Sequence, residues 1–409
     1  MQRTPQFKKF LKTARKHRKE NFWDVCYDIS APTFTNSIIS DYFGMRSTQH
    51  TVSEQNISIE KEDIKTNKTT PDKNLLVNKV DFDKCDFSGN NGGKKITFLD
   101  CKFHECYFSF SEFNDTSFKN CKFESCSFSQ SKFFRCVFDS RCIFYRISLS
   151  GGTTSFENTE INATKFFKDV YKPYIEKKEL YAKKNKKEHI EEYLLSKSIV
   201  KLSRKILASN QSCANDELYY DSVKNLYLQK LNEKQKYNTN SLMESIENIQ
   251  SKKEYSKSRK NKETEYITKE FLKVMVFYLK NLALPLEKKI TQIFGFINGW
   301  GGSLQRMFFI GLCILFVYSI IYSIMDLGYV TYKSSDGITE KIHVEGYYYI
   351  MSSIIKSFDI TFLAGYTKHI SNTDGLFKQF TILSNMLMGL FWYAVAIPSL
   401  INKISINRL

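Results

Sequence analysis

Histidine is scarce in this sequence: six residues in 409, and those six are scattered. The ten cysteines form no Cys-x-x-Cys pair. The chain also shows no nucleophile elbow, no phosphate-binding glycine loop and no pairing of histidines with carboxylates. Such patterns carry much of hydrolytic and metal-assisted chemistry. We therefore expect a protein that is not an enzyme and that holds neither a metal ion nor a cofactor.

Long apolar runs are missing from the first 300 residues, so nothing near the N-terminus is typical of a signal peptide. Two uncharged runs follow, Met307–Met325 and Phe380–Ile401. Each matches the roughly 20 apolar residues that a helix needs to cross a bilayer. A pair of buried core helices is the alternative. Lys and Arg flank both runs on their outer sides, so the positive-inside rule predicts cytoplasmic termini, although lysines also lie between the runs.

Positive charge is in excess by 17 and is concentrated at the start of the chain. The first 20 residues hold eight Lys or Arg and one Glu. Phe7, Phe10 and Leu11 fall on one helical face among these charges, which is typical of a segment that binds anionic lipid or an acidic partner. A disordered tail is the alternative. We assign residues 1–79 to a basic N-terminal segment, partly helical or disordered.

Phenylalanine recurs every five residues in the next part of the chain. A small or modest residue, often cysteine, precedes each phenylalanine by two positions. The uninterrupted run comprises Phe98, Phe103, Phe108, Phe113, Phe118, Phe123, Phe128, Phe133 and Phe138. A period of five fits neither a helix nor a strand. It predicts a chain that turns a corner every five residues and stacks its inward side chains in continuous ladders.

This spacing resembles the pentapeptide-repeat family over residues 80–168. The resemblance implies a right-handed, four-sided β-helix with four units per coil. The sequence departs from the family by using Phe at the centre of each unit and Cys or Ser where Ala is usual. The frame shifts near Cys142 and Thr154, and its last units are Thr154/Phe156, Thr159/Ile161 and Thr164/Phe166.

The chemistry of the repeat favours a protein partner over nucleic acid. The cysteines are predicted to be buried thiols that act as small hydrophobes. Some family members imitate DNA with an acidic surface, but Val80–Phe166 holds eleven acidic and eleven basic residues. DNA mimicry is therefore disfavoured, and so is nucleic-acid binding by the charged region that follows. An unidentified cytoplasmic ligand or protein is the expected partner of the repeat.

Residues 169–298 are predicted to form a polar helical region and a linker. Glu217–Leu231 has an amphipathic pattern, and Tyr266–Leu284 is predicted to be helical. Asn238–Glu265, rich in Lys, Ser and Asn, is assigned to a linker or mobile loop. The sequence GWGGSLQRMF at residues 299–308 then leads into the first apolar run. Together with ELYYDSV, it loosely resembles bacterial pentapeptide-repeat proteins that continue into a two-helix ion-channel module.

The segment between the two apolar runs predicts a pore loop. Residues 346–361 are apolar enough for a helix that enters half of the membrane, and Leu-Ala-Gly-Tyr-Thr follows. This order resembles the two-transmembrane pore-loop channels of the potassium-channel superfamily. Overlaying their TVGYG filter by its Gly-Tyr matches two positions and replaces its first Thr and last Gly. The resemblance assigns the filter to Thr361, Leu363, Ala364, Gly365, Tyr366 and Thr367.

Three classes of function follow, of which an enzyme has no support. The first is a homotetrameric channel in residues 299–409, because two helices cannot enclose a path alone, with potassium or non-selective monovalent cations as the permeant ions. Gly389 is a candidate gating hinge, with packing against the first apolar span as the alternative. The second is a membrane-anchored interaction scaffold that does not conduct. The resemblance to bacterial proteins implies the bilayer of an inner membrane, with both termini cytoplasmic.

Overall fold

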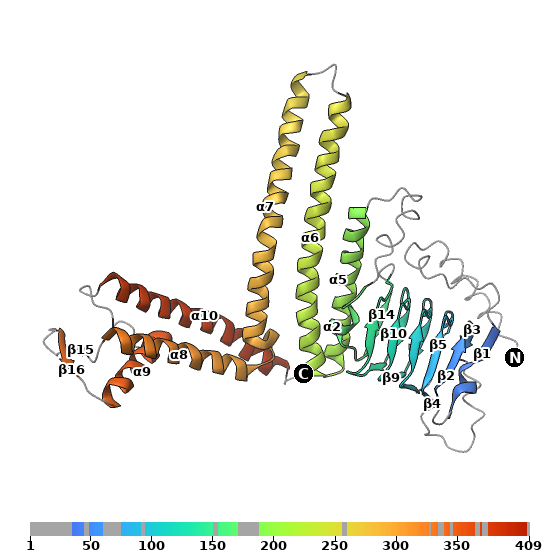
Figure 1. Ribbon diagram of the computed structural model, residues 1–409, viewed down its shortest axis with the longest axis horizontal. Helices are drawn as coiled ribbons and strands as arrows, with labels where there is room; N and C mark the ends of the chain where they lie inside the picture. The colour runs from blue at the N-terminus through green and yellow to red at the C-terminus, as the bar shows by residue number, and fades with distance from the viewer. Residues whose placement is uncertain are drawn as a thin grey trace. The chain divides into compact units, whose positions relative to one another are not determined.

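A computed structural model describes residues 35–44, 49–59, 75–90, 95–149, 154–170, 188–255, 260–326, 329–333, 339–343, 347–364, 369 and 375–406 (Figure 1). The chain divides into two compact units, Met1–Lys288 and Lys289–Leu409. This division falls inside one long helix, ten residues before the predicted boundary at residue 299, and the predicted domain bounds remain predictions. The lipid-binding prediction for Phe7, Phe10 and Leu11 lies outside the described residues.

The first unit contains a four-sided β-solenoid of parallel strands. Three sides are hydrogen-bonded sheets. Their strands are β2 (His50–Ser53), β5 (Val80–Asp83), β7 (Lys102–His104), β10 (Lys122–Glu124) and β13 (Ile143–Tyr145); β4 (Leu75–Asn78), β6 (Ile96–Leu99), β9 (Ser117–Lys119) and β12 (Val137–Phe138); and β8 (Glu112–Asn114), β11 (Lys132–Phe134) and β14 (Ser155–Glu157). A row of single bridges, Asp86–Tyr107–Ser127–Ser148, forms the fourth side.

The strand register confirms four five-residue units per turn. Phe82 pairs with Phe103, 21 residues later, and Phe103 pairs with Phe123, 20 residues later. The rings of Phe82, Phe103 and Phe123 stack nearly parallel, with successive centroids 5.2 and 4.9 Å apart. All nine phenylalanines of the uninterrupted run are buried. Burial of each ring contributes about 1.5–3 kcal/mol, so the ladder contributes strongly to the stability of the solenoid.

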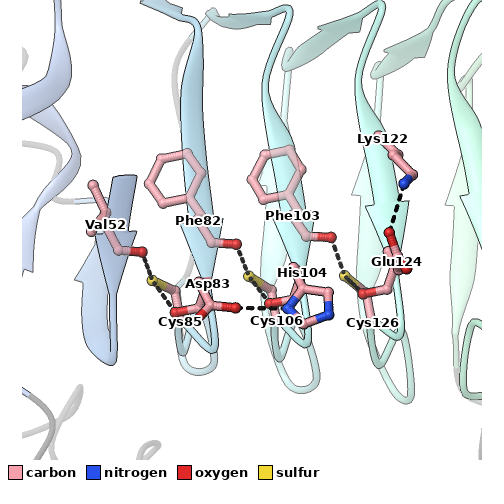
Figure 2. Close-up of polar contacts among 10 residues, drawn as sticks. All are labelled: Val52, Phe82, Asp83, Cys85, Phe103, His104, Cys106, Lys122, Glu124 and Cys126. Atoms are coloured by element: carbon pink, nitrogen blue, oxygen red, sulfur yellow. Dashed lines mark hydrogen bonds and ion pairs between the residues drawn. The ribbon is translucent and has the colours of Figure 1, made fainter. Parts of the chain in front are cut away.

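The cysteine thiols form a second interior ladder, which Figure 2 shows for three turns. Cys106 donates through its Sγ to the carbonyl oxygen of Phe82 at 3.2 Å, and Cys126 donates to that of Phe103 at 3.3 Å. Each thiol therefore reaches back to the preceding turn. The seven solenoid cysteines are buried and free, which confirms their prediction as core residues. Among the described residues, no cluster of three or more His, Cys, Asp or Glu could hold a metal ion.

Left-handed backbone marks the corners of the solenoid. The residue before most of the small inward side chains has a positive φ, as at Asp100 (54°), Asp115 (54°) and Asn120 (52°). Such a conformation costs an L-residue about 1–2 kcal/mol. The corner is tolerated because it points the next side chain into the core and restarts the strand in register. The five-residue period is thus a backbone requirement as well as a packing one.

The solenoid begins earlier than predicted. β1 (Thr35–Ile38) pairs with β3 (Gln55–Ser58), and β2 pairs with β5. Val52 and Ile57 are buried in the same core as the phenylalanines. Residues 35–44, 49–59 and 75–79 are therefore not part of a basic tail. The sequence hid this start because Val, Ile and Leu replace Phe and long insertions break the period.

Helices close the other end of the solenoid. The predicted final unit, Thr164/Phe166, is instead a short helix, α2 (Ala163–Phe166), in which Thr164 is exposed and Phe166 is buried. α5 (Glu188–Ser212) then lies against the last strands. Its Ser209 hydroxyl accepts from Thr159 N at 2.7 Å and donates to Thr159 O at 2.8 Å. The cap thus provides hydrogen bonds that a further turn would otherwise make.

Two long helices extend from this cap. The prediction that Asn238–Glu265 is a linker or mobile loop is wrong. α6 (Asp216–Tyr255) and α7 (Lys260–Asn298) include most of Asn238–Glu265. Within the first unit they lie side by side: Lys234 Nζ is 2.6 Å from a carboxylate oxygen of Glu287, and the Tyr237 and Phe277 rings are 6.4 Å apart. The stretch contains no Gly or Pro, and its Lys, Glu and Gln are good helix formers. Polar composition alone therefore misled the prediction.

The second unit contains the turn and helices that follow α7. A short 3₁₀ turn, η2 (Gly299–Gly301), leads into α8 (Leu304–Asp326). A hairpin that the sequence did not suggest, β15 (Tyr329–Lys333) with β16 (Thr339–His343), precedes α9 (Tyr347–Thr361). The final helix is α10 (Leu376–Ile406). In the turn, Gly299, Trp300 and Gly301 all have positive φ, and the Trp300 ring lies where a side chain on Gly295 would stand.

Candidate functional site

Two helices of the second unit are long and apolar enough to cross a membrane. The spans are Leu304–Met325 in α8 and Leu376–Ile401 in α10. Large apolar side chains stand exposed along both, including Phe309 and Phe316 on α8 and Phe380 on α10, each at least 65% exposed. Soluble monomers rarely expose apolar surface on this scale. Such exposure is typical of helices that cross a membrane or that pack against other protein.

α9 is polar on the inside and apolar on the outside. Its buried residues are Ser353, Lys356, Ser357, Ile360 and Thr361. Its exposed large side chains include Tyr347, Tyr348, Ile350, Ile355 and Phe358. A helix on the surface of a soluble protein has the opposite polarity. This reversal is typical of a helix whose outer surroundings are lipid or apolar protein, with polar side chains bonded inside the bundle.

The C-terminal end of α9 meets both spans near their midpoints. Ser357 Oγ donates to the carbonyl oxygen of Leu315, near the middle of α8, at 2.8 Å. A Cβ built on Gly389, near the middle of α10, would lie 1.9 Å from the carbonyl oxygen of Thr361. A helix of 15 residues is about 22 Å long, shorter than the roughly 30 Å hydrocarbon core. If α8 and α10 cross a bilayer, α9 ends near its midplane.

A buried amide joins all three helices at this point. Thr361 Oγ1 donates to Asn385 Oδ1 at 2.7 Å, and Asn385 Nδ2 donates to the Tyr322 hydroxyl at 3.1 Å. The Thr361, Asn385 and Tyr322 side chains are all 0% exposed. The Lys356 ammonium lies over the Tyr322 ring, 4.8 Å from its centroid. A charged group within an apolar bundle is costly unless it is held in this way, and such groups often mark functional positions.

The end of α9 is shaped by backbone geometry. Leu363 has φ 56°, a left-handed conformation that a bulky residue rarely adopts, and its N–H donates to Ile360 O at 3.3 Å. Ala364 follows and is exposed. Further along, His369 Nε2 lies 3.0 Å from Asp359 Oδ2, so this contact spans the predicted filter sequence. Gly365, Tyr366 and Thr367 lie outside the described residues.

The structure places Thr361 and Gly389 in direct contact but leaves the filter itself untested. Gly389 packs against the end of α9, not against the first span, because only a glycine lets the Thr361 carbonyl come so close. Its role as a gating hinge remains a prediction. Sequence reasoning missed Asn385, Tyr322 and Lys356. The signal for two of them was available: a lone Asn in the second apolar run and a Lys in the short apolar helix.

The outer surface of the solenoid carries ladders of mixed charge. His104 Nδ1 lies 2.6 Å from Asp83 Oδ1, and Lys122 Nζ lies 2.7 Å from Glu124 Oε2. Figure 2 draws both contacts. The hydrogen bond from Lys122 lowers the pKa of Glu124, with His104 a smaller cause. A groove of about 360 Å³ runs along one corner. Its lining residues include Lys79, Asp100, Lys102, Asn120, Lys122 and Arg141. Both signs of charge therefore alternate on this surface.

Comparison with known proteins identifies the repeat. The family model for pentapeptide repeats matches residues 101–139, with eight copies. These residues are pentapeptide repeats. Among solved structures, one match is a trypsin-treated variant of QnrB1, a plasmid-mediated fluoroquinolone resistance protein. The two sequences are 11% identical in the matched region, and the TM-score is 0.12. The match covers 31% of this chain and 72% of the other protein's chain. No curated protein matches the chain.

Proposed function

We propose that this chain is the subunit of a cation channel in which four copies surround a pore. The observation that carries the proposal is the end of α9, which meets the middle of both apolar helices at Leu315 and Gly389. Non-helical backbone at membrane depth is tolerated only where protein buries it or water fills a path. The chain emerging from α9 at Leu363 fits such a path, and the negative end of the helix dipole there favours cations.

The predicted filter stays part of this proposal. Backbone carbonyls near Leu363, Ala364, Gly365 and Tyr366 would face the axis and replace the hydration shell of the ion. Leu363 and Thr367 stand where a potassium filter has Thr and Gly, so we expect weak discrimination between potassium and sodium. Four copies are required because one loop supplies a quarter of a ring, and a closed cyclic ring is the usual solution. In this proposal both termini are cytoplasmic, in a bacterial inner membrane.

The solenoid is the interaction domain of the proposed channel. Pentapeptide repeats suggest a protein-interaction role, and the mixed-charge ladders of Asp83, His104 and Glu124 offer a patterned surface for it. A membrane-anchored scaffold that does not conduct is the second candidate. The observation that favours it is the match itself, which covers residues of the solenoid and none of the helices.

Ion flux into liposomes tests the proposal. The purified full chain is reconstituted and challenged with a potassium or a sodium gradient, beside a Gly365→Val variant. We expect flux of both ions from the wild type and less from the variant, because Val restricts the backbone and adds bulk at the ring. Absence of flux under every condition, together with a monomeric mass, would favour the scaffold.

A further inference from the structure

The outward face of α7 carries an apolar stripe that nothing in the described part of the chain covers. Its eight large side chains are between 47% and 67% exposed. They are Phe271, Leu272, Met275, Val276, Tyr278, Leu279, Leu282 and Leu286. All lie in the first unit, and we call this set the α7 stripe. An apolar face of this width on a helix is normally buried against another element.

The spacing of the α7 stripe matches a heptad repeat over two heptads. Leu272, Leu279 and Leu286 are seven residues apart, and Met275 and Leu282 are also seven apart, three positions after the first two. These are the a and d positions of a heptad repeat. The flanking e and g positions carry no charge; they hold Phe271, Val276, Tyr278, Ala283 and Pro285. The apolar face is therefore wider than the seam of a two-stranded coiled coil.

The opposite side of α7 is already occupied by α6. The f positions of the same heptad are Glu270, Phe277 and Leu284; Glu270 is 4% and Leu284 5% exposed, and the Phe277 ring contacts the Tyr237 ring of α6. On a helical wheel the f position lies opposite the a/d seam. Binding by α6 therefore leaves the stripe pointing away from its own hairpin.

The area of the α7 stripe is enough for a stable interface. Eight apolar side chains at about half exposure present roughly 700 Å² on one helix. A standard protein interface takes about 800 Å² from each partner. A helix lying on a membrane surface has a strongly charged opposite face. In α7 that side is packed against α6, so a protein partner fits better than lipid.

We propose that the α7 stripe binds the α7 stripe of further copies of this chain, as a parallel helical bundle. The heptad seam argues for helix-on-helix contact, and the parallel arrangement rests on the proposed function, since cyclic symmetry brings identical positions together around one axis. In such a bundle Leu279 of one copy lies beside Leu279 of the next. The bundle would join the cytoplasmic bodies through a contact independent of the apolar spans.

Cysteine cross-linking of the full-length protein in liposomes tests this arrangement. The seven solenoid cysteines are buried, so Cys26, Cys213 and Cys313 are first replaced by serine. Leu279→Cys and Leu286→Cys are then oxidised with a copper catalyst. Both are expected to form disulfide-linked dimers. Lys280→Cys, exposed on the same turn but off the seam, is the matched control and should give at least about tenfold less dimer.

Three outcomes would overturn the proposal. Equal cross-linking at positions 279 and 280 indicates random collision. Cross-links only between unlike positions, such as Leu272→Cys with Leu286→Cys, indicate an antiparallel pair. Protection of Leu279→Cys and Leu286→Cys from a thiol reagent in liposomes, but not in lipid-free protein, indicates that the α7 stripe lies on a membrane surface.

Leu282→Asp on the Leu279→Cys background should abolish the dimer without unfolding the chain, because Leu282 is 67% exposed within one copy. Flux recorded from the same liposomes separates this proposal from the channel: flux without cross-links contradicts only the bundle.

Discussion

The side-chain amide of Asn210 makes both backbone hydrogen bonds of Ile161. Its Oδ1 accepts from Ile161 N at 3.1 Å, and its Nδ2 donates to Ile161 O at 2.8 Å. The same Nδ2 also donates to Ser222 Oγ of α6 at 2.7 Å. Asn210 thus imitates a peptide group of the missing next turn and joins the open end of the solenoid to both helices. The solenoid, α5 and the start of α6 are therefore joined by hydrogen bonds into one body.

Replacing Asn210 by alanine should destabilise the first unit. The change leaves the Ile161 N–H and C=O without their side-chain partner at a buried site, which costs about 2–4 kcal/mol. Urea unfolding of a fragment covering residues 1–288 measures the effect. Asn232→Ala on the exposed face of α6 is the matched control and should cost less than about 0.5 kcal/mol. Equal midpoints for the two variants would show that the cap adds nothing.

A charge in the phenylalanine ladder should collapse the solenoid. Phe118 stacks between Phe98 and Phe138, with ring centroids 5.2 and 4.7 Å away, and is 0% exposed. Phe118→Asp buries a carboxylate with no partner and costs several kcal/mol. Phe118→Leu, which stays apolar, is expected to lower the thermal midpoint only modestly. A melting curve for Phe118→Asp that matches the wild type would contradict the ladder.

The buried thiols predict a loss of stability at high pH. Burial raises the pKa of Cys136 from 9.0 to about 12 and raises those of Cys106 and Cys121 as well. Above pH 9 the unfolded thiols lose protons while the folded ones keep them. The stability that each contributes is therefore complete below pH 9 and is lost as the pH rises towards the folded pKa.

The Cys136→Ser variant isolates this effect. Ser111 and Ser131 occupy equivalent positions of the repeat, so serine fits. At pH 10.5 the wild type should lose about 2 kcal/mol more, relative to pH 8, than the variant does. Urea midpoints at the two pH values measure the difference. Parallel pH profiles for the two proteins would mean that Cys136 is not shielded from water.

The solenoid could be predicted from the sequence because its units repeat. Nine phenylalanines at a spacing of five residues predicted a four-sided β-solenoid, and the structure confirms it. The early turns at β1–β3 were missed because Val52 and Ile57 carry no distinctive period. The α6–α7 hairpin was missed for a different reason. Lys, Asn and Ser are frequent in linkers, and only the burial of Asn238 and Ser245 in the folded chain reveals that the first part of this stretch is a packed helix.

Only part of the candidate site could be predicted from the sequence. Length and the absence of charge were enough to predict the two apolar runs and the short helix between them. The Thr361–Asn385–Tyr322 connection could not be predicted, because the three residues lie far apart in the chain and meet only when the helices pack. Gly389 illustrates the limit of a residue type: a glycine permits a bend and a close contact equally, and here the contact is present.

Gly389→Ala should disturb the end of α9 and lower ion flux. The new methyl group would stand 1.9 Å from the Thr361 carbonyl oxygen, and the nearest atoms are backbone, which cannot rotate away. Either α9 or α10 must shift, at a cost of about 1–3 kcal/mol. The shift moves Leu363 and the filter sequence that follows. Gly375→Ala, one residue before the same helix, is the matched control, because nothing lies within 4 Å of its added methyl group. Reconstituted flux should fall for Gly389→Ala and stay at the wild-type level for Gly375→Ala. Equal flux from both variants, in protein of unchanged mass and helix content, would show that the packing of the end of α9 does not affect conduction.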